Sequence, residues 1–163
     1  MKETAVELFN NYAFFLVFLH VLGAIVWVGG MIGMRLAVHP GLQHIDDPKH
    51  RMARTLEIVR NLFALVLPFI VLILLTGLVM GLAVGAPGTD LATVVYVKEG
   101  IWLVMTANYA AMVYRRNVAE RRFVSGDMAG AREMMAPIPN LMLPVNIALG
   151  VLALVLGIYL RGF

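Results

Sequence analysis

One histidine lies inside a long apolar stretch of this chain, and it is the residue there most suited to chemistry. His20 sits in the sequence FLHVLGAIVWVGGMIG, and the residues on both sides of it are almost all apolar. An ionisable side chain at membrane depth is costly and usually has a function. A neutral imidazole can bind a metal ion or the iron of a haem. We therefore expect His20 to be a ligand, and the alternative is a hydrogen bond to a neighbouring helix.

Residues at helical spacing from His20 form one face that suits a flat cofactor. Steps of three, four and seven positions lead to small, aromatic and thioether side chains: Gly23, Ala24, Trp27, Gly30, Met31 and Met34. The glycines would give a porphyrin clearance, and the larger side chains would pack against it. Copper is the alternative metal, because thioether sulfur selects Cu(I). Methionines within membrane spans are more often core filler.

Lys98 is the second unusual residue, because it is a charge within a mostly apolar stretch. At 1.5 Å per residue, Lys98 lies roughly 7 Å into its span and His20 roughly 12 Å into its own, measured from the same outer face. These similar depths allow the two side chains to meet. Lys98 shares a helical face with Trp102, Met105 and Tyr109. It would pair with a haem propionate, donate to a substrate or ligate iron, and the alternative is that it snorkels to the interface.

Three more histidines and two aspartates occur together in one polar segment: His39, His44, His50, Asp46 and Asp47. No compact metal-ligand motif links them, so a metal site there is the less favoured interpretation. On a straight helix His39 is about 28 Å from His20, so the two cannot share one iron within a subunit. A sixth iron ligand would come from Lys98, from Met31 or Met105, from a small molecule, or from His20 of a second subunit.

The composition places the chain in the membrane class. Hydrophobic residues make up 61% of its 163 residues and charged residues 14%, whereas soluble domains are about half apolar and about a quarter charged. Apolar stretches of about 20 residues are typical of transmembrane helices. Four such stretches predict one all-α domain over residues 1–163, an integral membrane four-helix bundle: Tyr12 to Val38, Leu62 to Val84, Thr93 to Tyr114 and Leu141 to Leu160.

The basic residues gather after the first and third apolar stretches: Arg35, Lys49, Arg51, Arg54, Arg60, Arg115, Arg116, Arg121, Arg122 and Arg132. By the positive-inside rule both loops are cytoplasmic and both termini lie on the far side. We expect the bacterial inner (plasma) membrane, with these arginines contacting lipid headgroups and not nucleic acid. The first stretch is too long for a signal peptide. The absence of cysteine excludes disulfides, iron–sulfur clusters and covalent c-type haem.

Turn residues and small residues predict how the spans are connected and packed. We expect a loop over residues 39–50 with helix resuming near Arg51, an external turn over residues 85–90, a break at Ser125–Gly126, and a helical stretch to Met135 that prolines 137 and 139 end. Two small-residue pairs predict close helix contacts: Gly29 with Gly33, and Gly77 with Gly81. Five polar residues predict interhelical hydrogen bonds: Thr76, Asn108, Tyr109, Asn140 and Asn146.

The ordered motif of His20, Trp27 and Gly29–Gly30, followed by Arg35 and His39, resembles the first helix of HemJ-type protoporphyrinogen oxidases. It is equally similar to the copper-resistance protein D (CopD) domain. The other helices of that group resemble three further segments here: RTLEIVRNLFALVLPFIVLILLTGL, YVKEGIWLVMTANYAAMVYRR and IPNLMLPVNIALGVLALVLG. The similarity extends over about 130 residues in four short motifs.

The HemJ resemblance implies a b-type haem protein that oxidises protoporphyrinogen during haem synthesis. It implies His20 as the haem ligand and Lys98 as an essential polar group, with Arg35 a weaker candidate. HemJ proteins usually have histidines in the middle of the third helix, where this chain has ANYAAM, with Asn108 and Tyr109. The loop between the third and fourth helices is also longer here.

The leading expectation is a membrane haem b protein that acts in electron transfer or porphyrinogen oxidation, with quinone as a plausible acceptor. His20 would bind the iron, Lys98 and Arg35 would be catalytic, and five further residues would surround the cofactor: Gly23, Trp27, Gly30, Trp102 and Met105. The second expectation is a CopD-like copper transport or tolerance protein. The third is a non-catalytic membrane subunit, in a homo-oligomer or a larger complex, in which His20 is structural.

Overall fold

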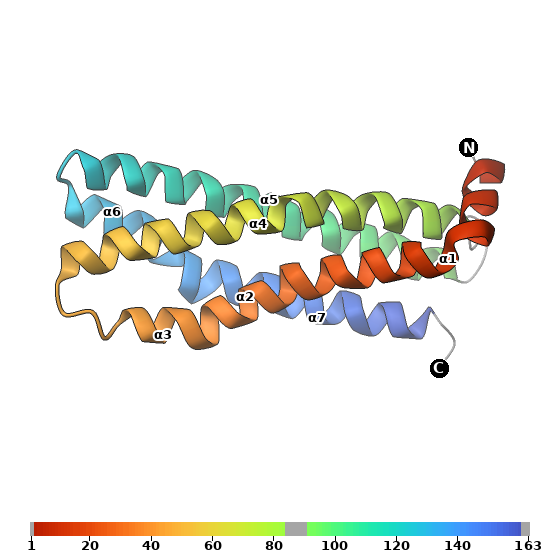
Figure 1. Ribbon diagram of the computed structural model, residues 1–163, viewed down its shortest axis with the longest axis horizontal. Coiled ribbons are helices and arrows are strands. Elements are labelled where there is room, and N and C mark those ends of the chain that lie inside the picture. Colours follow the sequence, from red (N-terminus) through yellow and green to blue (C-terminus); the bar gives the residue numbers. More distant parts are fainter. Residues whose placement is uncertain (1, 84–90, 161–163) are drawn as a thin grey trace.

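The structure, a computed structural model, describes residues 2–83 and 91–160 of the chain. Most of these residues are helical, and no β-strand occurs among them. The long helical segments run back and forth along one axis and form an elongated antiparallel bundle (Figure 1). The all-α class predicted from the sequence is confirmed.

The first helical segment has a kink near its start and two wide turns further on. The kink is at Tyr12, where φ is −130° and ψ is 23°, and the residues before it turn away from the bundle axis (Figure 1). The predicted apolar span begins at this same residue. Two π-helical turns follow, a geometry that is frequent at functional sites. The order is α1 (Lys2–Ala24), η1 (Ile25–Gly29), α2 (Gly30–Gly33), η2 (Met34–Val38) and α3 (His39–Leu42).

The prediction that helix gives way to a loop at His39 is wrong, because the helix continues through Pro40 to Leu42. A proline usually breaks a helix because it lacks an N–H and its ring collides with the carbonyl four residues earlier. Here the His39 N–H donates to the carbonyl of Met34, five residues back. The turn just before Pro40 is therefore wide, and the helix passes the proline.

The next segment, α4 (Pro48–Ala83), begins earlier than the predicted start near Arg51. The Asp47 side chain accepts hydrogen bonds from the N–H groups of Lys49, at 3.0 Å, and His50, at 3.3 Å. Pro48 occupies the first turn, where no N–H donor is needed. An aspartate cap followed by proline therefore sets this helix start.

The predicted break at Ser125–Gly126 is confirmed. α5 (Leu91–Val124) ends there, and Gly126 has a φ of +88°. Asp127 then accepts a hydrogen bond from the Gly130 N–H at 2.8 Å and caps α6 (Met128–Met135). The predicted external turn over residues 85–90 lies outside the described residues.

The prediction that prolines 137 and 139 end the helical path is wrong. A nearly continuous helical segment runs from Met128 to Tyr159. It contains the π-helix η3 (Ile138–Met142), with Pro139 in its first turn, and then α7 (Leu143–Tyr159), with Pro144 in its first turn. Within η3 the Leu143 N–H donates to the carbonyl of Ile138, five residues back, so the turn that contains Pro139 is wide and the helical path passes the proline.

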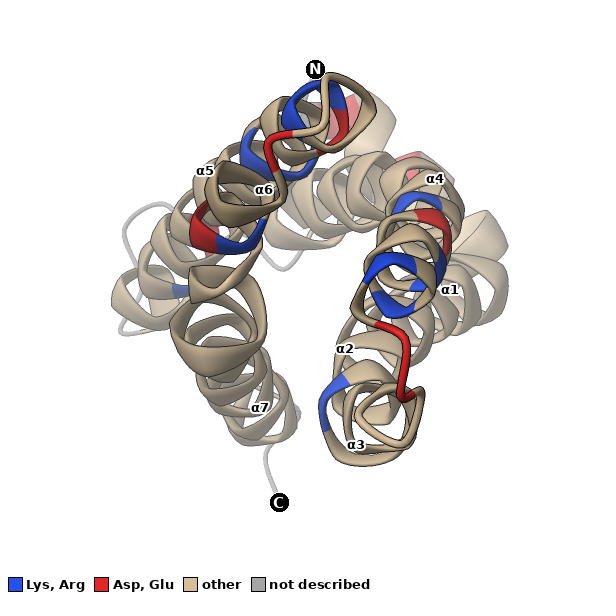
Figure 2. Cartoon of the chain, turned by 90° about the vertical axis from the view of Figure 1, so that its left-hand side faces the viewer, with Lys and Arg blue, Asp and Glu red and all other residues tan. Residues whose placement is uncertain are grey.

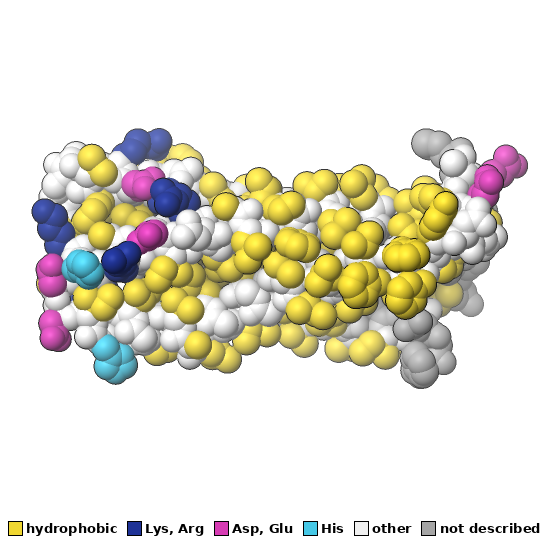
Figure 3. Space-filling model, in the orientation of Figure 1, with side chains coloured by type: hydrophobic (Ala, Val, Ile, Leu, Met, Phe, Trp, Pro, Cys, Tyr) yellow, Lys and Arg dark blue, Asp and Glu magenta, His cyan; other side chains and the backbone are white. Residues whose placement is uncertain are grey.

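Three helical segments are long and apolar enough to cross a membrane: Glu3–Leu42, Pro48–Ala83 and Met128–Tyr159. Apolar side chains cover the middle of the molecule, and charged and histidine side chains gather at the end where α3 meets α4 (Figure 3). Seen from that end, Lys and Arg residues lie on α4 and α5 (Figure 2). This distribution of side chains is that of a membrane protein built as a helical bundle.

α4 and α5 pack along a seam of heptad spacing. Buried residues of α4 alternate at steps of four and three: Met52, Leu56, Val59, Phe63, Val66 and Ile70. Three side chains of α5, seven residues apart, donate to carbonyls of α4 that are also seven residues apart: Trp102 Nε1 to Ile70 at 3.2 Å, Tyr109 Oη to Phe63 at 2.8 Å, and Arg116 Nε to Leu56 at 3.2 Å. These bonds fix one antiparallel register and confirm the interhelical bond predicted for Tyr109.

Two asparagines fasten α7 to α5. Asn146 Nδ2 donates to the carbonyl of Met105 at 3.1 Å, and Asn108 Nδ2 lies 2.7 Å from Asn146 Oδ1 and 2.8 Å from the carbonyl of Met142. Asn146 is fully buried. The interhelical bonds predicted for both residues are confirmed. Asn140 differs, because it is exposed and donates within its own segment to the carbonyl of Ala136.

Candidate ligand site at His20

His20 lies on α1 and is hydrogen-bonded to α4. Its Nδ1 is 2.8 Å from Thr76 Oγ1, and the Thr76 hydroxyl donates to the carbonyl of Leu72 at 2.7 Å. A hydroxyl has one proton, so Thr76 accepts from the histidine while it donates to its own helix. With the Thr76 proton on Leu72, the neutral imidazole carries its own proton on Nδ1 and its lone pair on Nε2.

This hydrogen bond agrees with the structural alternative for His20 and is also compatible with a ligand role. A histidine that binds a metal through one nitrogen generally donates its other N–H to an oxygen acceptor, which fixes the tautomer and the ring orientation. The Thr76 hydroxyl is such an acceptor, and it is held in turn by Leu72. The interhelical bond predicted for Thr76 is confirmed, and sequence reasoning had missed that its partner is His20.

A glycine lies directly beside the imidazole. A Cβ atom at Gly77 would be 3.3 Å from His20 Cε1, so even an alanine there would press on the ring. A Cβ at Gly81 would lie 3.3 Å from Val95 of α5. The predicted close contacts of this glycine pair are confirmed. Gly29 and Gly33 differ, since no heavy atom of another described residue would lie within 4 Å of a Cβ at either.

Gly23 and Gly30, which were expected to leave space for a porphyrin, pack against α4 instead. A Cβ at Gly23 would lie 2.7 Å from Ile73, and one at Gly30 would lie 3.1 Å from Leu62. Both neighbours belong to α4. These glycines therefore let the first helical segment and α4 approach each other closely, and the space beside them is filled.

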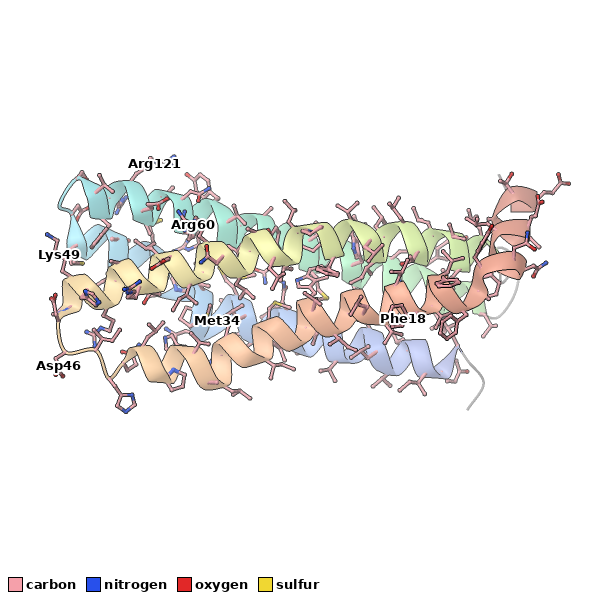
Figure 4. The ribbon with its side chains drawn as sticks, in the orientation of Figure 1. Phe18, Met34, Asp46, Lys49, Arg60 and Arg121 are labelled. Carbon is pink, nitrogen blue, oxygen red and sulfur yellow. The ribbon has the colours of Figure 1, made fainter. Side chains whose placement is uncertain are left out.

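The aromatic and thioether residues of the same face are core residues. Trp27 lies in η1 and is only 2% exposed, and its Nε1 has no hydrogen-bond partner among the described residues. Met31, Met34 and Met105 are buried in the same hydrophobic core; Met34 is labelled in Figure 4. Trp102 is half-buried, and its N–H donates to the carbonyl of Ile70. Of these side chains, Trp27 alone keeps an unused polar donor in the described part of the core.

Lys98 is half-buried on α5 and reaches towards α7. Its Nζ lies 2.9 Å from the position that a Cβ would take at Gly157, so the ammonium group rests against the backbone of α7. No hydrogen bond joins Lys98 to His20, which packs against Gly77 of α4, and their meeting stays a prediction.

Arg35 is not part of this region. It lies on η2, and fifteen residues of helix separate it from His20, which is about 22 Å along the axis. Arg35 is half-buried and forms no ion pair with the residues described. The structure therefore does not bring Arg35 to His20 and Lys98.

No group of three or more His, Asp or Glu side chains within residues 2–83 and 91–160 is placed to hold a metal ion. In the polar segment, Asp47 caps α4 and His44 Nδ1 is 3.2 Å from the carbonyl of Pro40. A metal at His20 would therefore need its other ligands from a macrocycle or from sulfur. Haem fits this donor set, because its porphyrin supplies four nitrogens and the protein needs to supply only an axial ligand.

Comparisons with protein-family models, with curated proteins and with solved structures find no match to this chain. The interpretation of the site therefore depends on its residues and their geometry.

Proposed function

We propose that this membrane protein binds one haem b through Nε2 of His20 and acts in electron transfer or porphyrinogen oxidation. The observation that carries the proposal is the chain of hydrogen bonds from His20 through Thr76 to Leu72, which engages Nδ1 so that Nε2 is the nitrogen that would bind the iron.

Haem, when bound, supplies one-electron redox chemistry, and the protein around it sets its potential and its access to substrate. Thr76 orients His20 and, as an acceptor for Nδ1–H, makes Nε2 a stronger ligand. Lys98 places a positive charge in the same region, where it would pair with a propionate or with an anionic substrate. The electron acceptor in this proposal is a quinone, which is soluble in the bilayer around the bundle.

The visible spectrum of the detergent-purified protein, oxidised and then reduced with dithionite, tests this proposal. We expect a Soret band, and in the reduced protein α and β bands of the b type. Lys98→Ala should keep the protein folded while it lowers turnover or shifts the spectrum, and Glu99→Ala, its exposed neighbour, should do neither. A protein that binds no haem even after reconstitution would contradict the proposal.

Copper handling is the second candidate function. It is favoured by the burial of Met31, Met34 and Met105 in one core, because thioether sulfur binds Cu(I). Metal analysis on the same purified sample separates the two functions: a colourless protein that carries copper would favour transport or tolerance. A sample with neither haem nor copper would favour the third expectation, a structural subunit of a membrane complex.

We also propose that α5 is a fourth membrane span, with both termini outside and the basic end in the cytoplasm of a bacterial cell. α5 is 34 residues long and runs antiparallel to α4 in the heptad register. Its length, about 51 Å, exceeds the hydrocarbon thickness. The gathering of Lys and Arg at one end of the bundle supports the orientation (Figure 2).

The chain has no cysteine, so single-cysteine variants can report this topology directly. Gln43→Cys and Ser125→Cys should both be shielded from a membrane-impermeant maleimide in intact cells and should both react once the membrane is opened. Glu7→Cys should react in intact cells. Labelling of Gln43→Cys and Ser125→Cys from opposite sides would show that α5 does not span the membrane.

A further inference from the structure

A groove lies between α5 and the segment formed by η3 and α7. Its volume is about 480 Å³. On α5 it begins at Asn108 and ends at Arg115, a distance of about 10 Å along the helix. On the other side it is lined by Leu141 and Val145, among others. It therefore runs from the apolar middle of the bundle towards the basic end.

Local sequence explains why the groove is there. Ala111, in the middle of its α5 wall, has no side-chain atom beyond Cβ and fills little of the gap. The opposite wall begins at Pro137, where α6 gives way to the wider turn of η3. Leu141 is 62% exposed and Tyr114 is 66% exposed, so the walls open to the outer surface of the bundle. In a membrane that surface faces lipid.

Arg115 provides a fixed positive charge at the basic end of the groove. Its Nε donates to the carbonyl of Met134 at 3.1 Å and its Nη2 to the carbonyl of Glu133 at 3.4 Å, both in the last turn of α6. These bonds hold the guanidinium in place but do not neutralise it. No carboxylate of the described residues lies within ion-pair distance of Arg115. Arg116 differs, because Glu120 neutralises it at 2.6 Å.

We propose that this groove binds one anionic phospholipid, with its phosphate on Arg115 and an acyl chain along Ala111 towards Val145. The charge is complementary, because an unneutralised guanidinium at the membrane interface attracts an anionic headgroup and pairs well with phosphate. The groove continues from that charge into the apolar middle of the bundle, as an acyl chain does. A free phosphate ion would bind to Arg115 but would not contact the apolar walls of the groove.

Native mass spectrometry of the detergent-purified protein tests the proposal. Phosphatidylglycerol and phosphatidylcholine with the same acyl chains are titrated in parallel. One Lys or Arg near the membrane surface favours an anionic lipid by about fivefold. We therefore expect the first bound phosphatidylglycerol to bind about fivefold more tightly than phosphatidylcholine. Glycerol phosphate, which has no acyl chains, should not displace it.

Two pairs of variants separate the charge from the groove. Arg115→Gln should remove the preference for phosphatidylglycerol. Arg60→Gln should keep it, because Arg60 is an exposed arginine of α4 outside the groove (Figure 4). Ala111→Leu should fill the groove and weaken both lipids, whereas Ala110→Leu, at the exposed neighbouring position, should weaken neither.

Each contrary outcome overturns the proposal. Equal affinity for the two lipids would remove the role of the charge, and displacement by glycerol phosphate would make the site a phosphate site. If Arg115→Gln and Arg60→Gln lose the preference equally, the charge acts through the general surface and not through the groove. Circular dichroism checks that each variant is folded. If Arg115→Gln does not fold, the comparison of Ala111→Leu with Ala110→Leu tests the groove instead, and equal lipid affinity of these two variants would overturn the proposal.

Discussion

Replacing Thr76 with valine should weaken haem binding far more than it weakens the fold. Valine keeps the shape of the side chain but removes the hydroxyl that accepts from His20 Nδ1 at 2.8 Å. The imidazole then loses the group that fixes its tautomer and orientation. Mutating such a supporting partner typically costs about 10- to 100-fold in metal affinity. We expect a loss of that size for haem.

The cost to the fold should be much smaller. Side-chain hydrogen bonds between membrane helices are worth about 0.6 kcal/mol on average and at most about 1.7 kcal/mol. Such a change lowers the unfolding midpoint slightly and leaves the bundle intact. A loss of haem affinity by tenfold or more corresponds to at least about 1.4 kcal/mol, so the two effects can be told apart.

The chain offers a matched control for this experiment. Thr106 is on α5, and its hydroxyl is buried without a hydrogen-bond partner among the described residues. Thr106→Val makes the same chemical change without removing a bond, so its haem affinity should match that of the unmodified protein. Both variants are titrated with haem in detergent and followed at the Soret band. Equal haem affinity of Thr76→Val and Thr106→Val would refute the reasoning.

Three further predictions concern packing. Tyr109→Phe should lower the free energy of unfolding in detergent by about 0.6 kcal/mol, because it loses the bond to α4, while the exposed Tyr114→Phe should not change it. Asn146→Ala should cost about 1–3 kcal/mol in the same assay, since it leaves buried partners unpaired; an unchanged midpoint would contradict this. Gly77→Val should displace the imidazole and reduce haem occupancy, and Gly29→Val, which meets open space, should leave occupancy unchanged.

The helical segments and their breaks could be predicted because the responsible signals are local. Long apolar stretches predict the spans. Ser125 and Gly126 indicate the end of one helix, and Asp127 indicates the N-cap of the next. The prolines were misjudged because π-helical turns let the chain pass Pro40 and Pro139. A proline in the sequence indicates a helix break. The residue types do not show where a π-helical turn widens the helix and avoids that break.

The pairing within the candidate site could not be predicted because it depends on register. His20 and Thr76 are 56 residues apart, and their contact requires one particular alignment of α1 with α4. The polar pair Asn108 and Asn146 was recognisable as buried and polar, but not as partners. Arg116 was placed with the exposed loop arginines, although it is buried against α4 and neutralised by Glu120. The acidic residue four positions later was the available signal.

The haem content of His20→Ala, measured beside His39→Ala, tests the central claim most directly. Both variants remove one imidazole from the same helical segment, but His39 lies at the basic end, far from Thr76 and Lys98. Purified in parallel and assayed for haem per protein, His39→Ala should retain the haem of the unmodified protein. His20→Ala should lose it while its helical content stays the same. Full haem occupancy in His20→Ala would contradict the account.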